Sequence, residues 1–353
     1  MSNKTTMMKM ARLIGIRQFE ITEVPVPRLK PGWALVRMHS IGVCGSDIHY
    51  FSEGKIGDQI VKYPFSIGHE CAGTVVEVGK GVKNVKPGMR VAIDPAMPCG
   101  RCYLCKMGRE NICLSLQFLG CPSQVEGSLS EYLAMPAKNC IPVPDSMSFD
   151  EAVMTEPLAI AIHAVRLSGI KGGENVAVLG SGPIGLLTMM TALEYGAKKA
   201  FATDIIPERV AFAKNMGATK SFNIKTDDVI REIKKATKGR GVDIAYECAG
   251  QQDALDQAAQ VLRPGGKLMI LGIPSVERIS FIAILVRRHE IMIQNVRRQN
   301  RCVEEAIRLV AKGKLNGGRL VTHHFPFIKV NEAYDVVSKY QDGVIKAMVT
   351  MGD

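Results

Sequence analysis

Four cysteines near the end of the first third of the chain have the residue type and spacing of a metal site. They are Cys99, Cys102, Cys105 and Cys113, in the pattern C-x2-C-x2-C-x7-C. Four thiolates suit a closed tetrahedral zinc site with a structural role. An iron–sulfur cluster uses similar ligands and is the alternative. The pattern therefore predicts a structural zinc lobe at about residues 95–115.

A second set of residues whose side chains can bind a metal is spread more widely along the chain. Cys44 and His69 are 25 residues apart, Glu70 follows His69, and Glu156 comes later. Taken alone, the cysteine and the histidine are ordinary core residues, but together with carboxylates they favour a catalytic zinc with a position left open for water or substrate. Asp47 has the right type to bind the far ring nitrogen of His69 and fix the orientation of the ring.

A glycine-rich stretch has the spacing of a dinucleotide site. Residues 180–185, Gly-Ser-Gly-Pro-Ile-Gly, match G-x-G-x-x-G between an expected strand and an expected helix. The three glycines allow a tight turn, close approach to a pyrophosphate and close packing of helix on strand. Asp204, 19 residues after Gly185, is placed to accept the ribose hydroxyls and to repel the extra phosphate of NADP. NAD is therefore expected, with Arg209 as the reservation because arginine can bind a phosphate.

Two kinds of element must position these residues. Residues 12–150 contain short alternating apolar runs broken by glycine and proline, such as 34–38, 73–78 and 90–93, which is typical of strands in a β-rich domain. From about residue 157 the pattern alternates between buried strands and helices. The expected strands are 175–179, 199–203, 242–247 and 267–271, and the expected helices include 183–194 and 207–215. This alternation predicts an α/β fold with a parallel sheet and right-handed crossovers.

The last part of the chain carries a helix pattern at 303–311 and then apolar runs that can return to the first domain. Residues 176–193 are uncharged and long enough to raise the question of a membrane span. Gly180, Gly182 and Pro183 interrupt this stretch, which favours a strand, a turn and a helix start. We expect no membrane partner.

Composition and charge restrict the function classes. Lysine plus arginine, 45, against aspartate plus glutamate, 34, gives a net charge of +11, but the basic residues are scattered. Only 6% of residues are aromatic, and none of the runs interleaves them with arginine as a base-stacking surface requires. We expect no nucleic-acid partner. The start, residues 1–12, has no apolar segment of a secretory signal, and clustered cysteines favour a reducing compartment, so a cytoplasmic location is expected.

These residues carry a resemblance to a known family. Gly68-His69-Glu70-x2-Gly73-x5-Gly79-x2-Val82 resembles the signature of zinc-containing medium-chain alcohol dehydrogenases, and the four-cysteine loop resembles their structural zinc lobe. Within that family the chain is most similar to sorbitol (L-iditol) dehydrogenases and other polyol dehydrogenases. The similar segments are 44–50 (CGSDIHY), 54–57 (GKIG), 156–158 (EPL) and 320–326.

The resemblance covers nearly the whole chain and implies two domains. Residues 1–156 and 296–353 would form a GroES-like catalytic domain, and residues 157–295 a Rossmann NAD-binding domain. The family usually assembles as dimers or tetramers, so a homo-oligomer is expected, with one catalytic and one structural zinc in each subunit.

The resemblance also assigns roles to residues. Cys44, His69 and Glu70 would bind the catalytic zinc, with Glu156 reaching it directly or through water, where classical alcohol dehydrogenases have cysteine. Ser46 and His49 would carry the substrate proton outward. Substrate would contact Tyr50, Phe118, Glu156, Arg297 and Arg298. The implied cofactor contacts are Gly180, Gly182, Pro183, Ile184, Gly185, Asp204, Arg209, Leu271, Gly272, Ile273, Asn295, Val296 and Arg297.

Arg298 departs from the sorbitol dehydrogenase pattern, which has tyrosine at this position. If the guanidinium faces solvent, an ordinary polyol is expected, and if it faces the substrate, a cyclic polyol or one with a carboxylate or phosphate is expected. The predicted activity is the zinc-dependent oxidation of a secondary alcohol of a polyol to a ketone with hydride transfer to NAD. L-Threonine 3-dehydrogenase or another zinc alcohol dehydrogenase is the alternative, although Tyr50 and residues 54–57 favour the polyol type. A noncatalytic zinc or nucleic-acid-binding protein leaves the glycine-rich stretch unexplained.

Overall fold

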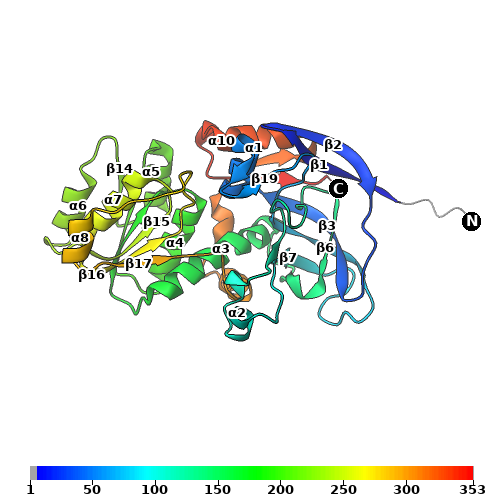
Figure 1. The fold of residues 1–353 in the computed structure, drawn as a ribbon, viewed down its shortest axis with the longest axis horizontal. Helices are drawn as coiled ribbons and strands as arrows, with labels where there is room; N and C mark the ends of the chain where they lie inside the picture. The colour runs from blue at the N-terminus through cyan, green and yellow to red at the C-terminus, as the bar shows by residue number, and fades with distance from the viewer. Residues whose placement is uncertain (1–5, 353) are drawn as a thin grey trace, which may run out of the picture. The chain divides into compact units, whose positions relative to one another are not determined.

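The computed structural model describes residues 6–352, and the chain divides into two compact units (Figure 1). The first unit is Met1–Glu156 with Val303–Asp353, and the second is Pro157–Cys302. The expected return of the chain to the first domain at residue 296 therefore lies seven residues before the observed one, Val303. The reason is that the backbone N–H of Val296 donates to the carbonyl of Ile270 at 2.8 Å, which ties this segment to the sheet of the second unit.

The first unit is built on one mainly antiparallel sheet, as the alternating apolar runs predict. Its strand order is β11 (Cys140–Pro142), β7 (Arg90–Ile93), β6 (Glu70–Val78), β3 (Trp33–Gly42), β19 (Lys346–Thr350) and β18 (Val321–Pro326), and β10 (Tyr132–Pro136) also pairs with β3. Three separate two-stranded sheets pair β1 (Met7–Gly15) with β2 (Gln18–Pro25), β4 (Lys55–Ile56) with β5 (Gln59–Ile60), and β8 (Ala96–Met97) with β9 (Gln117–Phe118). The ladder places Gly42, at the end of β3, opposite Glu70, at the start of β6. Two distant segments with candidate metal ligands are thereby brought to one place.

The first unit also contains short helices. They are α1 (Gly45–Glu53), α2 (Tyr103–Lys106), α9 (Val303–Ala311), α10 (Val330–Ser338), η1 (Glu110–Ile112), η2 (Ala137–Asn139), η3 (Gly317–Leu320), η4 (Phe327–Lys329) and η5 (Gln341–Gly343). Helix α3 (Phe149–Ser168) begins in the first unit and continues into the second. Phe51 of α1 stacks on Phe19, with ring centroids 5.6 Å apart, and lies at a tilt to the ring of Tyr334 of α10, with centroids 5.4 Å apart. These aromatic contacts hold α1 in place.

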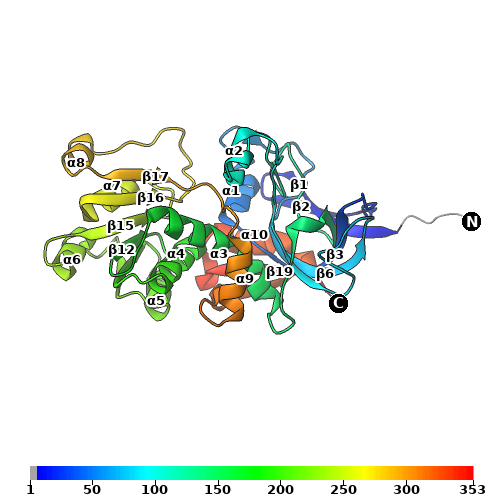
Figure 2. The same ribbon diagram turned by 90° about the horizontal axis from the view of Figure 1, so that it is seen from below.

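The second unit is the predicted parallel α/β sheet. Its strand order is β14 (Lys220–Asn223), β13 (Lys199–Asp204), β12 (Asn175–Leu179), β15 (Val242–Glu247), β16 (Leu262–Ile270) and β17 (Met292–Asn295). Figure 2 shows β12, β15, β16 and β17 side by side in that order. The helices are α4 (Pro183–Glu194), α5 (Pro207–Asn215), α6 (Val229–Ala236), α7 (Gln252–Val261) and α8 (Ala283–Arg288). The order of the strands reverses between β12 and β15, and such a point is where parallel sheets bind ligands at the carboxyl ends of their strands.

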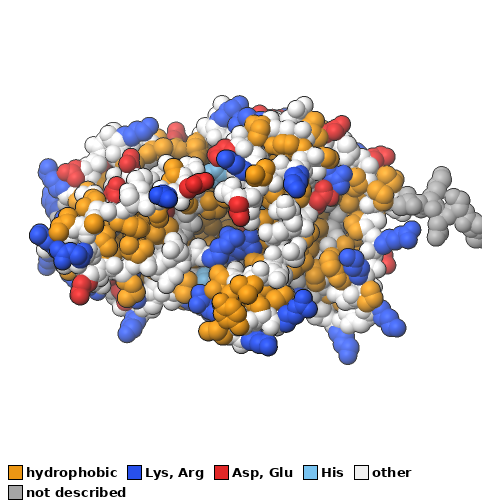
Figure 3. Space-filling view, viewed as in Figure 1, with side chains coloured by type: hydrophobic (Ala, Val, Ile, Leu, Met, Phe, Trp, Pro, Cys, Tyr) orange, Lys and Arg blue, Asp and Glu red, His pale blue; other side chains and the backbone are white. Residues whose placement is uncertain are grey.

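The uncharged stretch at residues 176–193 folds as β12, a turn and α4, as its glycines and proline predict. Over residues 6–352, each helix is too short or too polar to cross a membrane. On the face drawn in Figure 3, lysine and arginine side chains are spread in small groups among acidic, apolar and other side chains.

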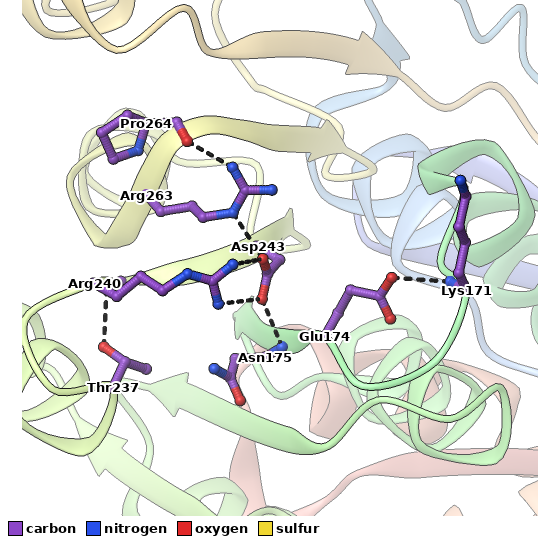
Figure 4. A network of polar contacts seen from close by, with 9 residues as sticks. Lys171, Glu174, Asn175, Thr237, Arg240, Asp243, Arg263 and Pro264 are labelled. Atoms are coloured by element: carbon purple, nitrogen blue, oxygen red, sulfur yellow. Dashed lines mark hydrogen bonds and ion pairs between the residues drawn. The ribbon is translucent and has the colours of Figure 1, made fainter.

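A buried carboxylate joins the amino ends of three strands in the second unit (Figure 4). The side chain of Asp243, at the start of β15, is 9% exposed. Its Oδ1 accepts hydrogen bonds from Arg240 Nη2 and Arg263 Nε, both at 2.7 Å, and its Oδ2 accepts from the backbone N–H of Asn175 at 2.9 Å. Burial acts to raise the pKa of Asp243, but these donors outweigh burial and hold the pKa below its usual value.

Replacing Asp243 with asparagine is expected to lower the free energy of unfolding by about 2 kcal/mol at neutral pH, because two partly exposed guanidinium groups lose their carboxylate. A carboxylate with a depressed pKa stabilises the fold above its unfolded-state pKa of about 3.9, and this contribution is lost as the pH falls through the lower folded-state pKa. Urea unfolding of both proteins, followed from neutral to acidic pH, checks this. The gap between them should narrow toward acid pH, and a constant gap would show that the ionised form is not what matters.

Candidate metal centres and cofactor site

Cys44, His69 and Glu70 form a compact group of metal-ligand types in the first unit. One ligand atom from each lies within 4.8 Å of the others. Cys44 precedes helix α1 as its N-cap residue, and Glu70 starts β6. A Cβ added at Gly42 would lie 2.5 Å from Glu70 Oε2, so β3 passes this carboxylate only because it has a glycine there.

His69 is held by a buried acid, as the sequence predicts. Its Nδ1 lies 3.2 Å from Asp47 Oδ1, and the Asp47 side chain is fully buried. Burial acts to lower the pKa of His69, but the charges of Asp47 and Cys44 outweigh burial and raise the pKa well above its ordinary value. Because Asp47 occupies Nδ1, the other ring nitrogen is the one available to a metal.

Lys346 is a buried member of this group that sequence reasoning missed. It lies on β19, is 2% exposed, contacts Glu70 Oε2 through Nζ and donates a hydrogen bond to the carbonyl of Val43 at 3.0 Å. Burial acts to lower the pKa of Lys346, but the charge of Glu70 outweighs it and raises the pKa. The signal in the sequence is one lysine inside the apolar run 344–349, VIKAMV.

Glu156 lies outside the compact group. Its side chain is buried, and its Oε2 has no hydrogen-bond partner in the part of the chain that the structure describes. Burial raises the pKa of Glu156 to about 8; Glu70 acts in the same direction, and His69 opposes it. A buried carboxyl with an unpaired oxygen that interacts with both His69 and Glu70 is suited to an outer position at a metal that Cys44, His69 and Glu70 hold.

Ser46 and His49 follow Cys44 on the same helix. Ser46 Oγ donates a hydrogen bond to Cys44 Sγ at 3.3 Å. His49 Nδ1 lies 3.1 Å from Glu53 Oε1, one helical turn further along. The hydroxyl of Ser46 therefore lies at the metal-ligand group. The imidazole of His49 is oriented by the carboxylate of Glu53, which is half exposed to solvent and is not indicated by the sequence alone.

The donor set of the compact group fits zinc. Thiolate, imidazole and carboxylate are zinc ligands, and three of them leave a fourth position for water or substrate. Buried Asp47, whose Oδ1 lies 3.2 Å from His69 Nδ1, supplies the carboxylate that orients a metal-bound histidine. These three residues could therefore hold a catalytic zinc.

The four cysteines of residues 99–113 also come together. One sulfur from each lies within 4.8 Å of the others. The backbone N–H of Cys99 donates to Cys113 Sγ at 3.3 Å, and that of Cys102 donates to Cys99 Sγ at 3.4 Å. Backbone donors lower the pKa of Cys102 to about 6. Thiolates supported by N–H groups in this arrangement fit a closed structural zinc.

The predicted substrate residues are distributed between the two units. Tyr50 is buried on α1, and the Phe118 ring lies 5.3 Å from the His69 ring between centroids. Arg297 is exposed and Arg298 half-buried, in the segment that follows β17 of the second unit. Phe118 is thus placed directly against a candidate metal ligand.

The glycine-rich stretch forms the turn between β12 and α4. Gly180 has a φ of +98°, and a Cβ added at Gly185 would lie 1.8 Å from the Gly180 carbonyl oxygen, so no other residue fits there. Gly182 is the N-cap of α4 and Pro183 its first residue. The first N–H groups of this helix are therefore available to a phosphate, as the motif predicts.

Asp204 lies at the end of the adjacent strand β13. Its Oδ2 accepts from the backbone N–H of Ser181 at 2.8 Å, and its Oδ1 accepts from that of Ile206 at 3.0 Å. Arg209 Nη1 lies 4.0 Å from Oδ2. The acid is thus fixed beside the glycine-rich turn, with the guanidinium of Arg209 close to both.

The remaining candidate cofactor residues lie at or just after the ends of β16 and β17, at the same edge of the sheet. They are Leu271, Gly272, Ile273, Asn295, Val296 and Arg297. Glu247, which sequence reasoning missed, ends β15 at this edge, and its Oε1 accepts from the backbone N–H groups of Ala249 and Gly250, each at 2.7 Å. It fixes the loop at the point where the strand order reverses. The feature of the sequence that could have indicated Glu247 is an acidic residue at the end of an apolar strand.

Comparison with known proteins matches this arrangement. The family described as "Alcohol dehydrogenase GroES-like domain" matches residues 30–145, and "Zinc-binding dehydrogenase" matches residues 183–312. A sorbitol dehydrogenase from Bacillus subtilis is 37% identical, over 97% of this chain and 97% of its own. The chain belongs to the zinc-dependent alcohol dehydrogenase family.

Two further relatives of this family extend the match. An L-idonate 5-dehydrogenase from Vitis vinifera is 36% identical, covering 93% of this chain and 91% of that protein. An oxidoreductase of unknown specificity from Escherichia coli has a similar crystal structure, with a TM-score of 0.93 and 32% identity over 99% of this chain and all of that one. The predicted membership of the family and the predicted fold class are confirmed.

Asp204 provides a test of the cofactor assignment in this family member. Replacing it with asparagine is expected to raise the KM for NAD by about 10-fold, because one charge-assisted hydrogen bond to the ribose is lost, and to improve NADP relative to NAD by a similar factor. The amide oxygen still accepts from one backbone N–H, so the fold should survive. Kinetics with both cofactors check the result, with a thermal melt as the control. An unchanged cofactor ratio would place the ribose elsewhere.

Proposed function

We propose that the protein oxidises a secondary alcohol of a polyol to a ketone and transfers the hydride to NAD. The observation that carries this proposal is the group of Cys44, His69 and Glu70 in a chain that also has the glycine-rich turn with Asp204. Relatives of this chain support a polyol or sugar-acid alcohol as substrate, because they include a sorbitol dehydrogenase and an L-idonate 5-dehydrogenase.

The protein groups divide into those that would hold a metal and those that would hold the cofactor. Cys44, His69 and Glu70, with Glu156 in an outer position, would hold the catalytic zinc, and the four cysteines would hold the structural zinc. The turn at residues 180–185 and Asp204 would hold NAD. When bound, the zinc supplies a Lewis acid for the alcohol oxygen and NAD supplies the hydride acceptor.

The side chains around the metal-ligand group would handle the proton. Ser46 Oγ, at 3.3 Å from Cys44 Sγ, is a hydroxyl beside the group where an alcohol would lose its proton. His49 and Glu53 continue toward solvent, since Glu53 is half exposed and lies 3.1 Å from the imidazole. Asp47 holds His69 in one orientation throughout. Tyr50, Phe118, Arg297 and Arg298 remain the proposed substrate contacts.

The decisive experiment is NAD reduction with a panel of alcohols before and after removal of zinc by a chelator. The panel contains sorbitol, xylitol, galactitol, myo-inositol, L-threonine, sugar acids and sugar phosphates. We expect turnover with polyols that is lost on chelation and recovered with zinc. Turnover with L-threonine alone would identify the alternative activity, and turnover only with anionic substrates would place Arg298 at the substrate.

We also propose that the protein is a homo-oligomer, dimer or tetramer, in the cytoplasm. Strand β17 is the outer strand of its sheet, and Met292 on it and Ile284 on α8 are both about half exposed. An unpaired edge strand with apolar neighbours is a ready surface for a second copy. All ten cysteines lie among the described residues and none of them forms a disulfide, which suits a reducing compartment. Light scattering during size-exclusion chromatography would give the subunit number.

A further inference from the structure

Tyr334 has a buried hydroxyl group that the proposed mechanism does not use. The residue lies on α10, its side chain is 0% exposed, and its Oη has no hydrogen-bond partner within residues 6–352. Buried side-chain hydroxyl groups in folded proteins nearly always have a partner, which is either another protein group or an ordered water. The position of this hydroxyl therefore calls for a physical reason.

The packing of α10 on α1 places Tyr334 on the same face of α1 as Asp47. Helix α10 lies beside α1 in the first unit (Figure 1). The ring of Tyr334 packs against Phe51 of α1 at 5.4 Å and against Phe19 at 4.9 Å between ring centroids. Asp47 comes four residues before Phe51 and is buried as well, so the two side chains share one face of the helix. The aromatic contact and the acid thus belong to one helix–helix interface.

Negative charges of the metal-ligand group act on the Tyr334 hydroxyl. Burial raises its pKa well above the ordinary value, and the charges of Asp47, Cys44 and Glu70 raise it further, with Asp47 acting most strongly of the three. The phenol therefore keeps its proton. It is a buried hydrogen-bond donor among groups that accept.

Two of these three groups already have partners. Cys44 Sγ accepts a hydrogen bond from Ser46 Oγ at 3.3 Å, and Lys346 Nζ contacts Glu70 Oε2. Cys44 and Glu70 are also candidate metal ligands, so a metal would use lone pairs that these partners leave. Neither group is therefore the natural acceptor for a further donor.

Asp47 has an acceptor oxygen left. Its Oδ1 lies 3.2 Å from His69 Nδ1, whereas its Oδ2 has no hydrogen-bond partner in the part of the chain that the structure describes. The buried donor of Tyr334 and the buried acceptor of Asp47 are complementary. A water that bonds to both is the usual way in which proteins satisfy such a pair.

We propose that Tyr334 is a positioning residue of the metal centre, whose O–H group supports Asp47 through buried water and thereby fixes the orientation of His69. A hydrogen bond to a carboxylate is charge-assisted, so it favours the ionised acid and restricts its rotation. A metal-bound histidine depends on that acid for its ring orientation and for the basicity of its ligating nitrogen. This inference rests on the zinc centre of the proposed function and does not depend on which alcohol is oxidised.

Tyr334→Phe removes the hydroxyl and keeps the ring that packs on α1. We expect the affinity for the catalytic zinc to fall by about 10-fold, because partners behind a metal ligand commonly have effects of this size. Competition with a chromophoric chelator measures this affinity in protein that keeps its four-cysteine zinc. With zinc saturating, kcat should fall and KM should change little, since the hydroxyl acts through the metal centre and not on substrate binding.

Tyr246→Phe is the matched control for the loss of a buried hydroxyl. Tyr246 is 0% exposed in the second unit, and its Oη forms a hydrogen bond with Ser168 Oγ at 2.8 Å. This variant should unfold at a lower urea concentration but bind zinc as tightly as the wild type. A general loss of stability is thereby separated from an effect on the metal centre.

A double variant tests the route through Asp47. Asp47→Asn should itself weaken zinc binding, and Tyr334→Phe should cause little further loss in that background. Wild-type zinc affinity in Tyr334→Phe, or an equal loss in both backgrounds, would show that the proposed role is wrong while the activity stands. If the wild type oxidises no polyol but Tyr334→Phe still weakens zinc binding, the proposed substrate is wrong and the role of Tyr334 stands. A wild type that binds zinc only at the four cysteines would overturn both.

Discussion

Replacing Cys44 with serine should lower kcat/KM by at least about 1,000-fold while the fold and the four-cysteine zinc are retained, because a metal that polarises an alcohol is worth several kcal/mol. Cys44 supplies the only thiol among the three residues whose ligand atoms lie within 4.8 Å of one another. A serine hydroxyl is a much weaker zinc ligand than a thiolate, so the site should lose its metal. Steady-state kinetics and metal analysis check both parts, with bound zinc falling from two to one per subunit.

A second cysteine serves as the control for this experiment. Cys140 is fully buried in the first unit, and its sulfur lies 3.9 Å from the carbonyl oxygen of Pro136. Cys140→Ser should keep both zinc ions and the activity, with at most a loss of stability. If Cys44→Ser retained wild-type turnover, the assignment of the catalytic zinc to Cys44, His69 and Glu70 would be wrong.

The parts of this site that the sequence predicts are those whose spacing is local. The four cysteines lie within 15 residues, and the glycine-rich turn is one strand–helix connection, so each motif contains its own geometry. Cys44 and His69 are further apart in the sequence, but Cys44 follows β3 and His69 precedes β6. These two strands pair, with Gly42 opposite Glu70 in the ladder. The resemblance supplied the remaining roles, and the structure brings the first three ligands together while leaving Glu156 outside that group.

The parts that the sequence does not predict depend on long-range packing. Lys346 contacts Glu70 across 276 residues, because β19 pairs with β3 in the same sheet. No local pattern shows that a lysine in the last strand will face a carboxylate in β6. The return of the chain at Val303 instead of residue 296 has the same origin, since a hydrogen bond to Ile270 holds Val296 in the second unit.

Replacing Lys346 is expected to have the second large effect, because this lysine is the buried partner of Glu70, a candidate metal ligand. Lys346→Met should lower the free energy of unfolding by about 3–5 kcal/mol, since it leaves the Glu70 carboxylate buried without its partner. Both side chains are 2% exposed, so water does not replace the lost ammonium group. Urea unfolding of the zinc-depleted protein measures the effect without the metal's own contribution to stability.

Removing the charge of Glu70 tests whether the loss of its ion pair with Lys346 causes the destabilisation. In the double variant Lys346→Met with Glu70→Gln, no unpaired charge remains, so the double variant should be at least about 1 kcal/mol more stable than the sum of the two single losses predicts. If the two losses simply add, the lysine acts through packing and not through Glu70. Coupling would show that the apolar strand β19 carries its one charge to hold Glu70 at the metal-ligand group, a role that Gly42 supports by leaving room for the carboxylate.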